Sequence, residues 1–145
     1  MIFKTEAELE SYAEKLGESL KLPAVFELIG DVGAGKTTFT RALAKGLGVK
    51  EPVTSPSFSI SKRYAFPTGT LIHYDFYRLD EPGIMSSELA EALEIPNSVI
   101  VIEWGDKIRD LLPLEADTIK FKILDDGSRE LIFPKRAHLA EEPQK

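Results

Sequence analysis

The stretch Gly30-Asp31-Val32-Gly33-Ala34-Gly35-Lys36-Thr37 matches the pattern G-x-x-x-x-G-K-[ST], which is the sequence of a phosphate-binding loop. Gly30 and Gly35 allow the backbone to turn sharply and to approach a polyphosphate, which a Cβ atom would obstruct. The loop amides and the N-terminus of the following helix form a site for anions. Lys36 adds a positive charge for the β- and γ-phosphates, and the Thr37 hydroxyl is a ligand for Mg²⁺. The sequence therefore predicts a site for a nucleoside triphosphate.

The residues on either side of this loop fit the strand–loop–helix arrangement that the motif requires. Ala24–Ile29 is a short, mostly apolar segment that ends at Gly30, as expected of a strand. Thr38–Leu47 carries apolar residues at helical spacing, and Gly48 follows as a stop signal. The motif and its flanks together predict a protein of the α/β class.

The remaining segments predict a single P-loop NTPase-like domain with a mixed, mainly parallel sheet, flanking helices and antiparallel hairpins. A capping box at Thr5-Glu6-Ala7-Glu8 opens an amphipathic helix. A short helix starts at Ser86 or Ser87 and runs to Leu93. The expected strands are a half-buried one over Ser57–Arg63, its partner Leu71–Phe76 after a turn at Pro67–Thr70, the β-branched run Val99–Ile102, and a hairpin of Thr118–Leu124 with Arg129–Phe133.

Composition narrows the class of protein. The chain has 145 residues, enough for one domain, which we place at residues 1–134, followed by a polar tail at residues 135–145. Its formal charge is −6 without a basic block, which argues against a protein that grips nucleic acid by itself. The absence of cysteine excludes disulfides, thiolate catalysis and zinc–thiolate sites. No apolar run approaches membrane-spanning length and no signal peptide is indicated, so we expect a cytoplasmic protein without a membrane partner.

Hydrolysis of a bound nucleotide also requires a carboxylate near the metal and a group that positions water. In P-loop enzymes the metal carboxylate usually follows an apolar strand beside the strand of the loop. Glu103 follows Val99–Ile102, and Asp75 follows Leu71–Tyr74. Because Glu103 ends the more apolar strand and needs a partner there, we expect it to hold Mg²⁺ directly or through water. Asp75 is then the candidate that orients water or the Mg²⁺ shell, the alternative being a carboxylate in an ordinary turn.

Three further side chains close to these carboxylates each have more than one interpretation. His73 shares a strand face with Asp75 and either shuttles protons or is a hydrogen-bonded structural histidine, which we favour. Arg78 either reaches a phosphate or pairs with a carboxylate. Trp104, the only tryptophan, packs over the site, presents a surface to a partner or fills the core. We therefore treat these three as supporting or partner-contacting residues.

The segment Thr54–Ser57 lies where P-loop proteins commonly have a segment that senses the nucleotide. The hydroxyls of Thr54, Ser55 and Ser57 are suited to contact the γ-phosphate or Mg²⁺ and to order the loop when triphosphate is bound. The alternative is a proline-containing connector without a role in binding. Its position favours a switch-like segment.

Four motifs in this order resemble the bacterial TsaE (YjeE) family, P-loop ATPases needed for the synthesis of threonylcarbamoyladenosine in tRNA. They are Gly30–Thr38, Thr54-Ser55-Pro56-Ser57-Phe58, His73-Tyr74-Asp75-Phe76-Tyr77-Arg78 and Ile102-Glu103-Trp104. The phosphate loop alone is generic, whereas the third and fourth motifs at these separations are far more specific. The resemblance spans roughly residues 5–133. One departure is Ser57, where the family pattern has threonine; a hydroxyl is retained, so we expect its role to survive.

The resemblance implies a role for each matching residue. ATP would be held by the residues of the phosphate loop, which are Asp31, Val32, Gly33, Ala34, Gly35, Lys36, Thr37 and Thr38. Thr37 and Glu103 would bind Mg²⁺. Asp75 would support hydrolysis, together with Lys36 and Glu103 as the other catalytic groups.

The resemblance further implies contacts outside the four motifs. Family members also contact nucleotide from near the N-terminal helix and from the C-terminal hairpin, which would place Glu6 and Arg129 near ATP. They act with the TsaD and TsaB proteins, where TsaD transfers the threonylcarbamoyl group and ATP hydrolysis by the TsaE-like protein resets the complex. The tRNA would then be met only through that complex, which suits the acidic charge of this chain.

Two alternatives of different classes remain beside this ATPase. A small-molecule P-loop kinase needs a second substrate pocket and usually an arginine-bearing lid, and no arginine-rich insertion is visible. A nucleotide-gated assembly protein with negligible hydrolysis differs from the ATPase mainly in rate. A GTPase is disfavoured because the chain has no N-K-x-D segment that would read guanine.

Overall fold

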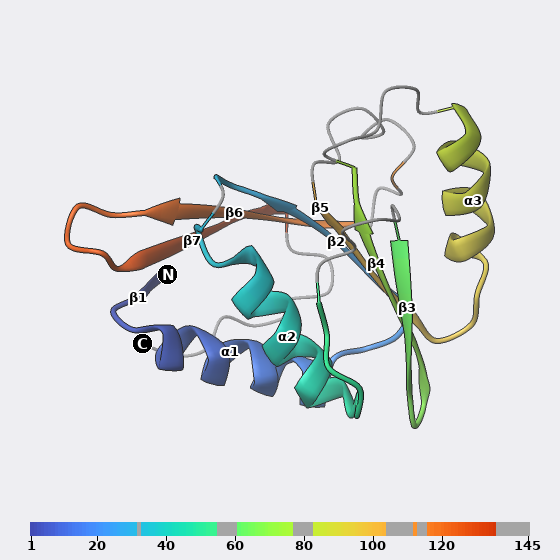
Figure 1. The fold of residues 1–145 in the computed structure, drawn as a ribbon, viewed down its shortest axis with the longest axis horizontal. Helices are drawn as coiled ribbons and strands as arrows, with labels where there is room; N and C mark the ends of the chain where they lie inside the picture. The colour runs from blue at the N-terminus through green and yellow to red at the C-terminus, as the bar shows by residue number, and fades with distance from the viewer. Residues whose placement is uncertain (32, 55–60, 77–82, 104–111, 113–115, 136–145) are drawn as a thin grey trace.

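A computed structural model describes residues 1–31, 33–54, 61–76, 83–103, 112 and 116–135 of the chain. Within these ranges the chain forms three helices and seven strands (Figure 1). The helices are α1 (Glu6–Ser19), α2 (Lys36–Leu47) and α3 (Gly83–Leu93). The strands are β1 (Ile2–Phe3), β2 (Ala24–Ile29), β3 (Ser61–Phe66), β4 (Gly69–Asp75), β5 (Ser98–Glu103), β6 (Asp117–Ile123) and β7 (Arg129–Lys135).

These strands form one sheet in the order β1-β7-β6-β2-β5-β4-β3. The central strands β6, β2, β5 and β4 are parallel to one another. β3 pairs antiparallel with β4 at one edge, and β7 pairs antiparallel with both β6 and β1 at the other. The predicted mixed sheet with antiparallel hairpins is therefore confirmed, and β2, the strand that precedes the phosphate loop, lies at its centre.

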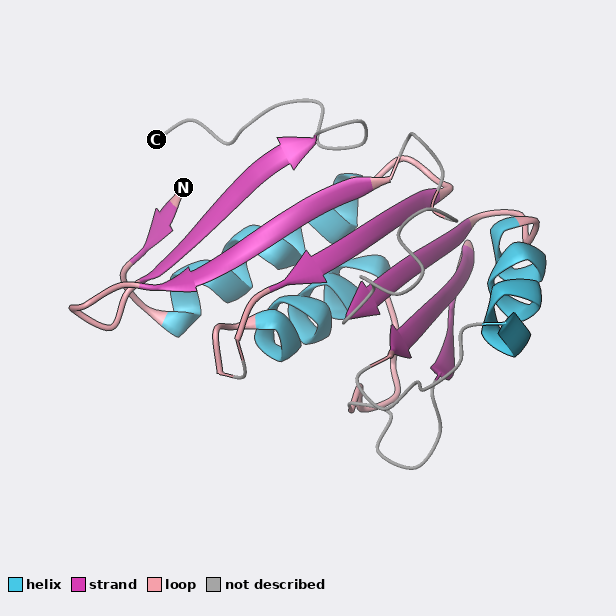
Figure 2. Ribbon diagram, turned by 90° about the horizontal axis from the view of Figure 1, so that it is seen from above, coloured by secondary structure: helices cyan, strands magenta, loops and turns pink. Residues whose placement is uncertain are grey.

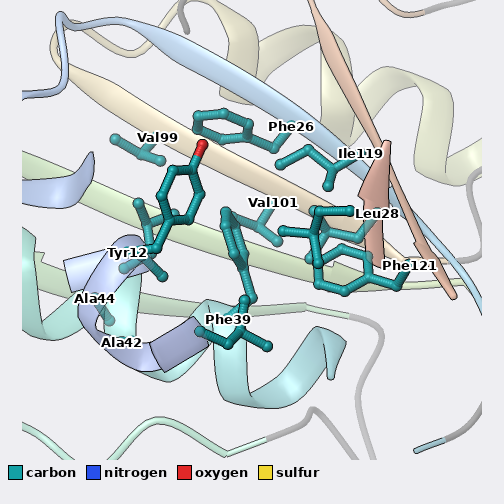
Figure 3. Close-up of a cluster of buried hydrophobic side chains, with 14 of the residues drawn as sticks. Tyr12, Phe26, Leu28, Phe39, Ala42, Ala44, Val99, Val101, Ile119 and Phe121 are labelled. Atoms are coloured by element: carbon teal, nitrogen blue, oxygen red, sulfur yellow. The ribbon is translucent and has the colours of Figure 1, made fainter. Parts of the chain in front are cut away.

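The central strands are buried because helices and their side chains cover both faces of the sheet. β5 is buried along its whole length and β2 in all but its last residue, as their apolar sequences require of parallel strands. Neighbouring residues face opposite sides, so Phe26 packs under α1 and α2 whereas Val25 packs with Leu89 of α3. Figure 2 shows α1 and α2 beneath the strands. In their cluster, Phe39 makes edge-to-face contacts with Phe26 and Phe121 (Figure 3).

α1 and α2 pack so closely that their backbones touch. A Cβ atom on Gly46 of α2 would collide with the carbonyl oxygen of Glu14 in α1, and one on Gly17 would collide with that of Leu43. Only glycine permits this approach at both positions, because it has no Cβ. The contact holds α1 against the helix that follows the phosphate loop.

The start of α1 agrees with the predicted capping motif in one of its two hydrogen bonds. Thr5 caps the helix, and its Oγ1 accepts a hydrogen bond from the Glu8 amide at 3.2 Å. The Glu8 carboxylate in turn accepts from the amide of Lys4 at 2.8 Å, one residue before the position that a capping box uses. The predicted helix start is therefore confirmed, with the reciprocal bond displaced by one residue.

The other two helices begin earlier than the sequence predicts. α2 begins at Lys36 rather than Thr38, because Gly35 acts as its N-cap in the left-handed region, with a φ of 111°. α3 begins at Gly83 rather than at Ser86 or Ser87. Sequence-based prediction of a helix start depends on a capping side chain or on the spacing of apolar residues. Glycine, at Gly35 and Gly83, provides neither signal.

The predicted strands are present, with shifts at their ends. β4 begins at Gly69, so that the turn between β3 and β4 consists of Pro67 and Thr68. β1 is not predicted, because two residues are too few to form a pattern. The first part of the strand expected from Ser57 and residues 136–145 of the expected tail lie outside the described residues. Lys135, which is expected to begin the tail, is the last residue of β7. None of the helices in the described part is long and apolar enough to cross a membrane.

Candidate nucleotide-binding site

The phosphate loop connects the end of β2 to the start of α2 (Figure 1). Residues of the loop line a cavity. The cavity has a volume of about 500 Å³. It is lined by residues from five places in the fold, namely the loop and start of α2, the start of α1, the ends of β4 and β5, and the β6–β7 hairpin. These lining residues are Thr5, Glu6, Leu9, Gly33, Gly35, Lys36, Thr37, Thr38, Asp75, Glu103, Gly127 and Arg129.

Two glycines shape the floor of this cavity. Gly33 and Gly35 have φ values of 84° and 111°, in the left-handed region that side-chain-bearing residues rarely adopt. A Cβ atom on Gly35 would lie 3.0 Å from the Cδ2 atom of Leu9 in α1, whereas one on Gly33 would meet nothing within 4 Å. The first amides of a helix have no partner within the helix, so the start of α2 suits a group with many acceptor oxygens. This arrangement fits a polyphosphate.

Gly30 has a packing role that the sequence does not indicate. A Cβ atom at this position would lie 2.7 Å from the carbonyl oxygen of Phe121 and 2.9 Å from its Cβ. The first glycine of the motif thus lets the loop pass directly over β6. Gly30 does not line the cavity itself.

Lys36 is almost fully buried at the base of the cavity, with 6% of its surface exposed. Its Nζ atom donates a hydrogen bond to the carbonyl oxygen of Gly30 at 2.6 Å. It also lies 3.9 Å from Oε1 of Glu103. The ammonium group is therefore held over the loop, between a backbone carbonyl and the carboxylate that the sequence assigns to the metal.

Asp75 and Glu103 lie side by side at the ends of β4 and β5, where they are partners in the parallel register. The amide of Phe76 donates a hydrogen bond to the carbonyl oxygen of Glu103 at 3.0 Å, which extends the pairing past the end of β4. Both carboxylates line the cavity that contains Lys36 and Thr37. The two candidates that the sequence leaves as alternatives for the metal thus lie next to one another.

Glu103 has a second buried partner in His73. The Nε2 atom of His73 lies 2.7 Å from Oε2 of Glu103, and both side chains are nearly inaccessible, at 1% and 6%. The hydrogen-bonded histidine that the sequence favours is therefore present, although His73 does not line the cavity.

The donors around the cavity fit Mg²⁺ in the form that accompanies a nucleotide. In the described part of the chain, no three acidic, histidine or cysteine side chains form a group that could hold a metal ion by themselves. Mg²⁺ commonly takes only one or two protein carboxylates and completes its shell with water and substrate phosphates. Thr37, Glu103 and Asp75 offer a hydroxyl and two carboxylates on the same cavity, which agrees with that mode of binding.

Two residues far from the phosphate loop in sequence reach the same cavity. Glu6 lies in the first turn of α1, and Arg129 begins β7. The Nη1 atom of Arg129 donates to the carbonyl oxygen of Gly127 at 2.6 Å, while its buried Nε atom has no partner among the described groups. The family resemblance implies both positions, and the pattern of the residues alone does not.

The turn before Arg129 is stabilised by its own side chains. Asp126 accepts hydrogen bonds from the hydroxyl and the amide of Ser128, and these bonds hold the pKa of the Asp126 carboxyl below its usual value. Gly127, within this turn, has a φ of 86° and lines the cavity. The hairpin tip is thus a defined wall of the site.

Three lining residues, Thr5, Leu9 and Gly127, are not predicted from the sequence as part of the site. Thr5 is predicted only as a helix cap, and Leu9 only as part of an apolar helix face. Gly127 is predicted only as a turn residue. A signal exists for Gly127, since it lies two residues before Arg129 in the hairpin that the resemblance brings to the nucleotide. No signal in the sequence indicates that the capped end of α1 meets the loop.

Other predicted residues lie elsewhere or outside the described part. Asp31 is exposed and Ala34 is buried in the core; neither lines the cavity, and the Ala34 amide donates to the Asp31 carbonyl at 3.1 Å. Thr54 is exposed and also does not line it. The predicted residues outside the described ranges are Val32, Ser55, Ser57, Arg78 and Trp104.

Thr54 is instead held by β3, and Val53, the residue before it, is held by α2. The hydroxyl of Tyr64 accepts a hydrogen bond from the Thr54 amide at 3.2 Å and donates one to its carbonyl oxygen at 3.1 Å. The Nζ atom of Lys62 donates to the Thr54 hydroxyl at 2.9 Å. Arg41 of α2 donates to the carbonyl oxygen of Val53 at 3.1 Å. The beginning of the predicted switch-like segment is therefore anchored on two elements of the core.

The chain is similar in sequence and structure to known proteins. Residues 3–131 match the family model described as threonylcarbamoyl adenosine biosynthesis protein TsaE. A TsaE protein of Nostoc sp. is 37% identical over 121 residues, covering 79% of this chain and 72% of the relative. One from Aquifex aeolicus is 36% identical over 135 residues, covering 90% and 92%. A crystal structure of Bacillus subtilis YdiB superposes with a TM-score of 0.73 at 32% identity, covering 92% of this chain and 82% of that one.

The family match covers the elements that build the cavity, from the start of α1 to the hairpin that carries Arg129. The order of motifs, the P-loop fold and the sequence identity over most of the chain agree with one another. The chain belongs to the TsaE family of threonylcarbamoyl adenosine biosynthesis proteins.

Proposed function

We propose that this protein is a Mg²⁺-dependent ATPase that acts in the threonylcarbamoyladenosine modification of tRNA. The observation that carries the proposal is that one cavity joins the glycine-lined start of α2, Lys36, and the adjacent carboxylates Asp75 and Glu103. These are the parts that phosphoryl transfer from a nucleotide to water requires: a phosphate cradle, a cation, a metal ligand and a group that positions water.

Each loop residue has a task in this proposal. The loop amides that have no partner within the loop, together with the first amides of α2, bind the phosphates of ATP, and Lys36 neutralises the β- and γ-phosphates. To do so, the Lys36 ammonium turns from the carbonyl oxygen of Gly30 toward the phosphate oxygens, which are stronger acceptors. Glu6 of α1 and Arg129 of β7 contact the nucleotide from outside the phosphate loop, which their presence in the lining of the cavity supports.

Thr37 and Glu103 would hold Mg²⁺ and Asp75 would act on water. Bound Mg²⁺ supplies positive charge that neutralises the phosphate oxygens during transfer. Asp75 orients a water molecule and takes its proton as the oxygen attacks the γ-phosphorus. The bond from that phosphorus to the bridging oxygen breaks, which leaves ADP and inorganic phosphate.

Membership of the TsaE family supports the proposal that this activity takes place together with partner proteins. We propose that the chain acts with TsaD and TsaB, that TsaD transfers the threonylcarbamoyl group, and that hydrolysis here resets their complex. The tRNA is then met only through the complex, in keeping with the formal charge of −6 and the lack of a basic block. In this proposal the protein acts in the cytoplasm. Thr54, with the residues after it, would sense the triphosphate.

The proposal is tested by the rate and the acceptor of phosphoryl transfer. ATP and GTP turnover are measured with Mg²⁺, with and without TsaB and TsaD. We expect slow hydrolysis of ATP by the protein alone, faster hydrolysis with the partners, and loss of turnover in Lys36→Ala. Lys45→Ala is the control, since its side chain is 74% exposed and lies outside the cavity. Transfer of phosphate to a small molecule would favour a kinase. ATP binding with no turnover, either alone or with TsaB and TsaD, would favour a nucleotide-gated assembly protein.

A further inference from the structure

The buried pair of His73 and Glu103 calls for an explanation beyond packing. His73 is 1% exposed and lies behind the cavity, two residues before Asp75 on β4. Its Nε2 atom is 2.7 Å from Oε2 of Glu103, the shortest separation expected for a strong bond between an imidazole and a carboxylate. The proposed reaction uses Glu103 and leaves His73 without a task.

The hydrogen bond to Glu103 fixes the role of one of the two ring nitrogens of His73. An ionised carboxylate only accepts hydrogen bonds, so Nε2 donates to Glu103. Nδ1 is buried and has no partner among the described groups. Among the described groups, His73 therefore has one side-chain hydrogen-bond partner, which is Glu103.

This single bond divides the two oxygens of Glu103 between different neighbours. Oε2 is held by His73, while Oε1 lies on the side of Lys36, at 3.9 Å from its Nζ atom. A glutamate has three side-chain torsions, and a buried carboxylate without His73 would gain most by turning both oxygens to the nearby ammonium. That full ion pair would withdraw Lys36 from the phosphates and Glu103 from a metal ion.

We propose that His73 is a positioning residue that keeps Glu103 oriented for the metal and prevents it from closing onto Lys36. This inference rests on the proposed function, because it assumes that Glu103 is a ligand of Mg²⁺. Partners that orient a ligand through its second polar atom commonly change metal affinity by about 10- to 100-fold when removed. His73 acts through Glu103 and does not touch the nucleotide.

The test compares three replacements that differ in reach. His73→Gln places an amide N–H four bonds from Cα, as far as Nε2 of histidine. His73→Asn is equally polar but one bond shorter, and His73→Leu removes the donor. Binding of Mn²⁺, used in place of Mg²⁺, is measured by electron paramagnetic resonance with the protein loaded with a non-hydrolysable ATP analogue. We expect about 10- to 100-fold weaker Mn²⁺ binding in the Asn and Leu variants and recovery to within a few-fold in Gln.

A double-mutant cycle separates orientation from general destabilisation. In a Glu103→Ala background, His73→Asn should change Mn²⁺ affinity no further, because the group that it orients is gone. Thermal unfolding identifies variants that lose the fold. If His73→Leu is one of them, the comparison of His73→Gln with His73→Asn still tests the proposal. The same weakening with and without Glu103 would overturn the proposal, as would wild-type Mn²⁺ affinity in folded His73→Asn.

The outcomes distinguish this inference from the proposed function. If Glu103→Ala weakens Mn²⁺ binding and His73→Asn does not, only the role of His73 is wrong. If Glu103→Ala leaves Mn²⁺ affinity unchanged, the metal role of Glu103 is wrong and the role of His73 falls with it.

Discussion

Asp75 and Glu103 are register partners on the parallel strands β4 and β5, and both carboxylates reach the cavity that contains the phosphate loop. Their surroundings differ, because Glu103 is buried against His73 and Lys36 whereas Asp75 is partly exposed. Two adjacent carboxylates in different surroundings are suited to different tasks. The buried one is proposed to bind metal and the more accessible one to act on water.

Asp75→Asn and Glu103→Gln should therefore have different kinetic effects. Asp75→Asn keeps the size of the side chain but removes the base, so we expect turnover to fall about 10²- to 10⁴-fold while ATP affinity stays within a few-fold. Glu103→Gln should instead raise the Mg²⁺ concentration needed for half-maximal turnover. Mg²⁺ titrations of the rate for both variants check this. Identical Mg²⁺ dependence in the two variants would show that the tasks are not divided in this way.

Gly46→Ala should loosen the wall of the site that α1 provides. The new methyl group meets the carbonyl oxygen of Glu14, which cannot move without displacing α1. We expect the free energy of unfolding to fall by about 1–3 kcal/mol, as in other overpacked contacts. Denaturant unfolding measures this, with Lys45→Ala on the same helix as the control. A stability equal to that of the wild type would mean that the two helices are not in backbone contact.

Tyr64→Phe should release Thr54 while it keeps the buried ring in place. The variant loses the hydroxyl that accepts from the Thr54 amide and donates to its carbonyl oxygen. We expect a loss of about 1–2 kcal/mol in the free energy of unfolding and faster hydrogen exchange of the Thr54 amide. Lys62→Met, which removes an exposed contact to the same residue, should cost less than about 0.5 kcal/mol. Unchanged exchange in Tyr64→Phe would contradict this anchoring.

Tyr74→Phe should change how stability depends on alkaline pH. Burial, with a smaller contribution from the charge of Glu88, raises the pKa of the Tyr74 phenol from 10.0 to about 12. The folded state thus holds this proton more tightly than the unfolded state, so the contribution to stability is complete below about pH 10 and is lost as pH rises toward 12. The variant should lack this part of the alkaline decline, which urea unfolding at several pH values measures.

At neutral pH the same variant should be close to wild type in stability. The buried hydroxyl of Tyr74 has no hydrogen-bond partner among the described groups, and its ring stacks on Phe76 at a centroid distance of 5.3 Å. Removing an unpaired buried hydroxyl while the ring remains changes stability by about 1 kcal/mol or less, in the favourable direction. A large loss of stability would reveal a hydrogen bond at this hydroxyl.

The sequence predicts the parts of the site that are built from local patterns. The glycines of the loop from Gly30 to Thr37 indicate its backbone conformation, and β2 and β5 are mostly apolar runs. The loop and these two strands can therefore be predicted from a few residues each. The strand order follows from these patterns only in part, since pairing between segments far apart depends on the packing of the whole sheet. The sequence predicts that Asp75 and Glu103 lie at strand ends, but their direct adjacency is a property of the β4–β5 register.

The walls of the cavity are harder to predict. Glu6, Leu9 and Arg129 reach it because α1 packs on α2 through glycine and because the β6–β7 hairpin extends past the loop. Neither contact leaves a periodic or motif signal, and only the family resemblance indicated Glu6 and Arg129. The phosphate-loop motif accounts for Gly30 only by its approach to a phosphate. Its close packing against Phe121 is a tertiary contact that the motif does not predict.

A single-turnover measurement shows whether this cavity binds ATP and passes its γ-phosphate to water. The protein, with TsaB and TsaD, is held in excess over ATP labelled in the γ-phosphate, and labelled inorganic phosphate is followed with Mg²⁺ present. We predict release of labelled inorganic phosphate by the wild type, and release at least about 100-fold slower in Asp75→Asn despite retained ATP binding. Release at the wild-type rate in both Asp75→Asn and Lys36→Ala would contradict the account.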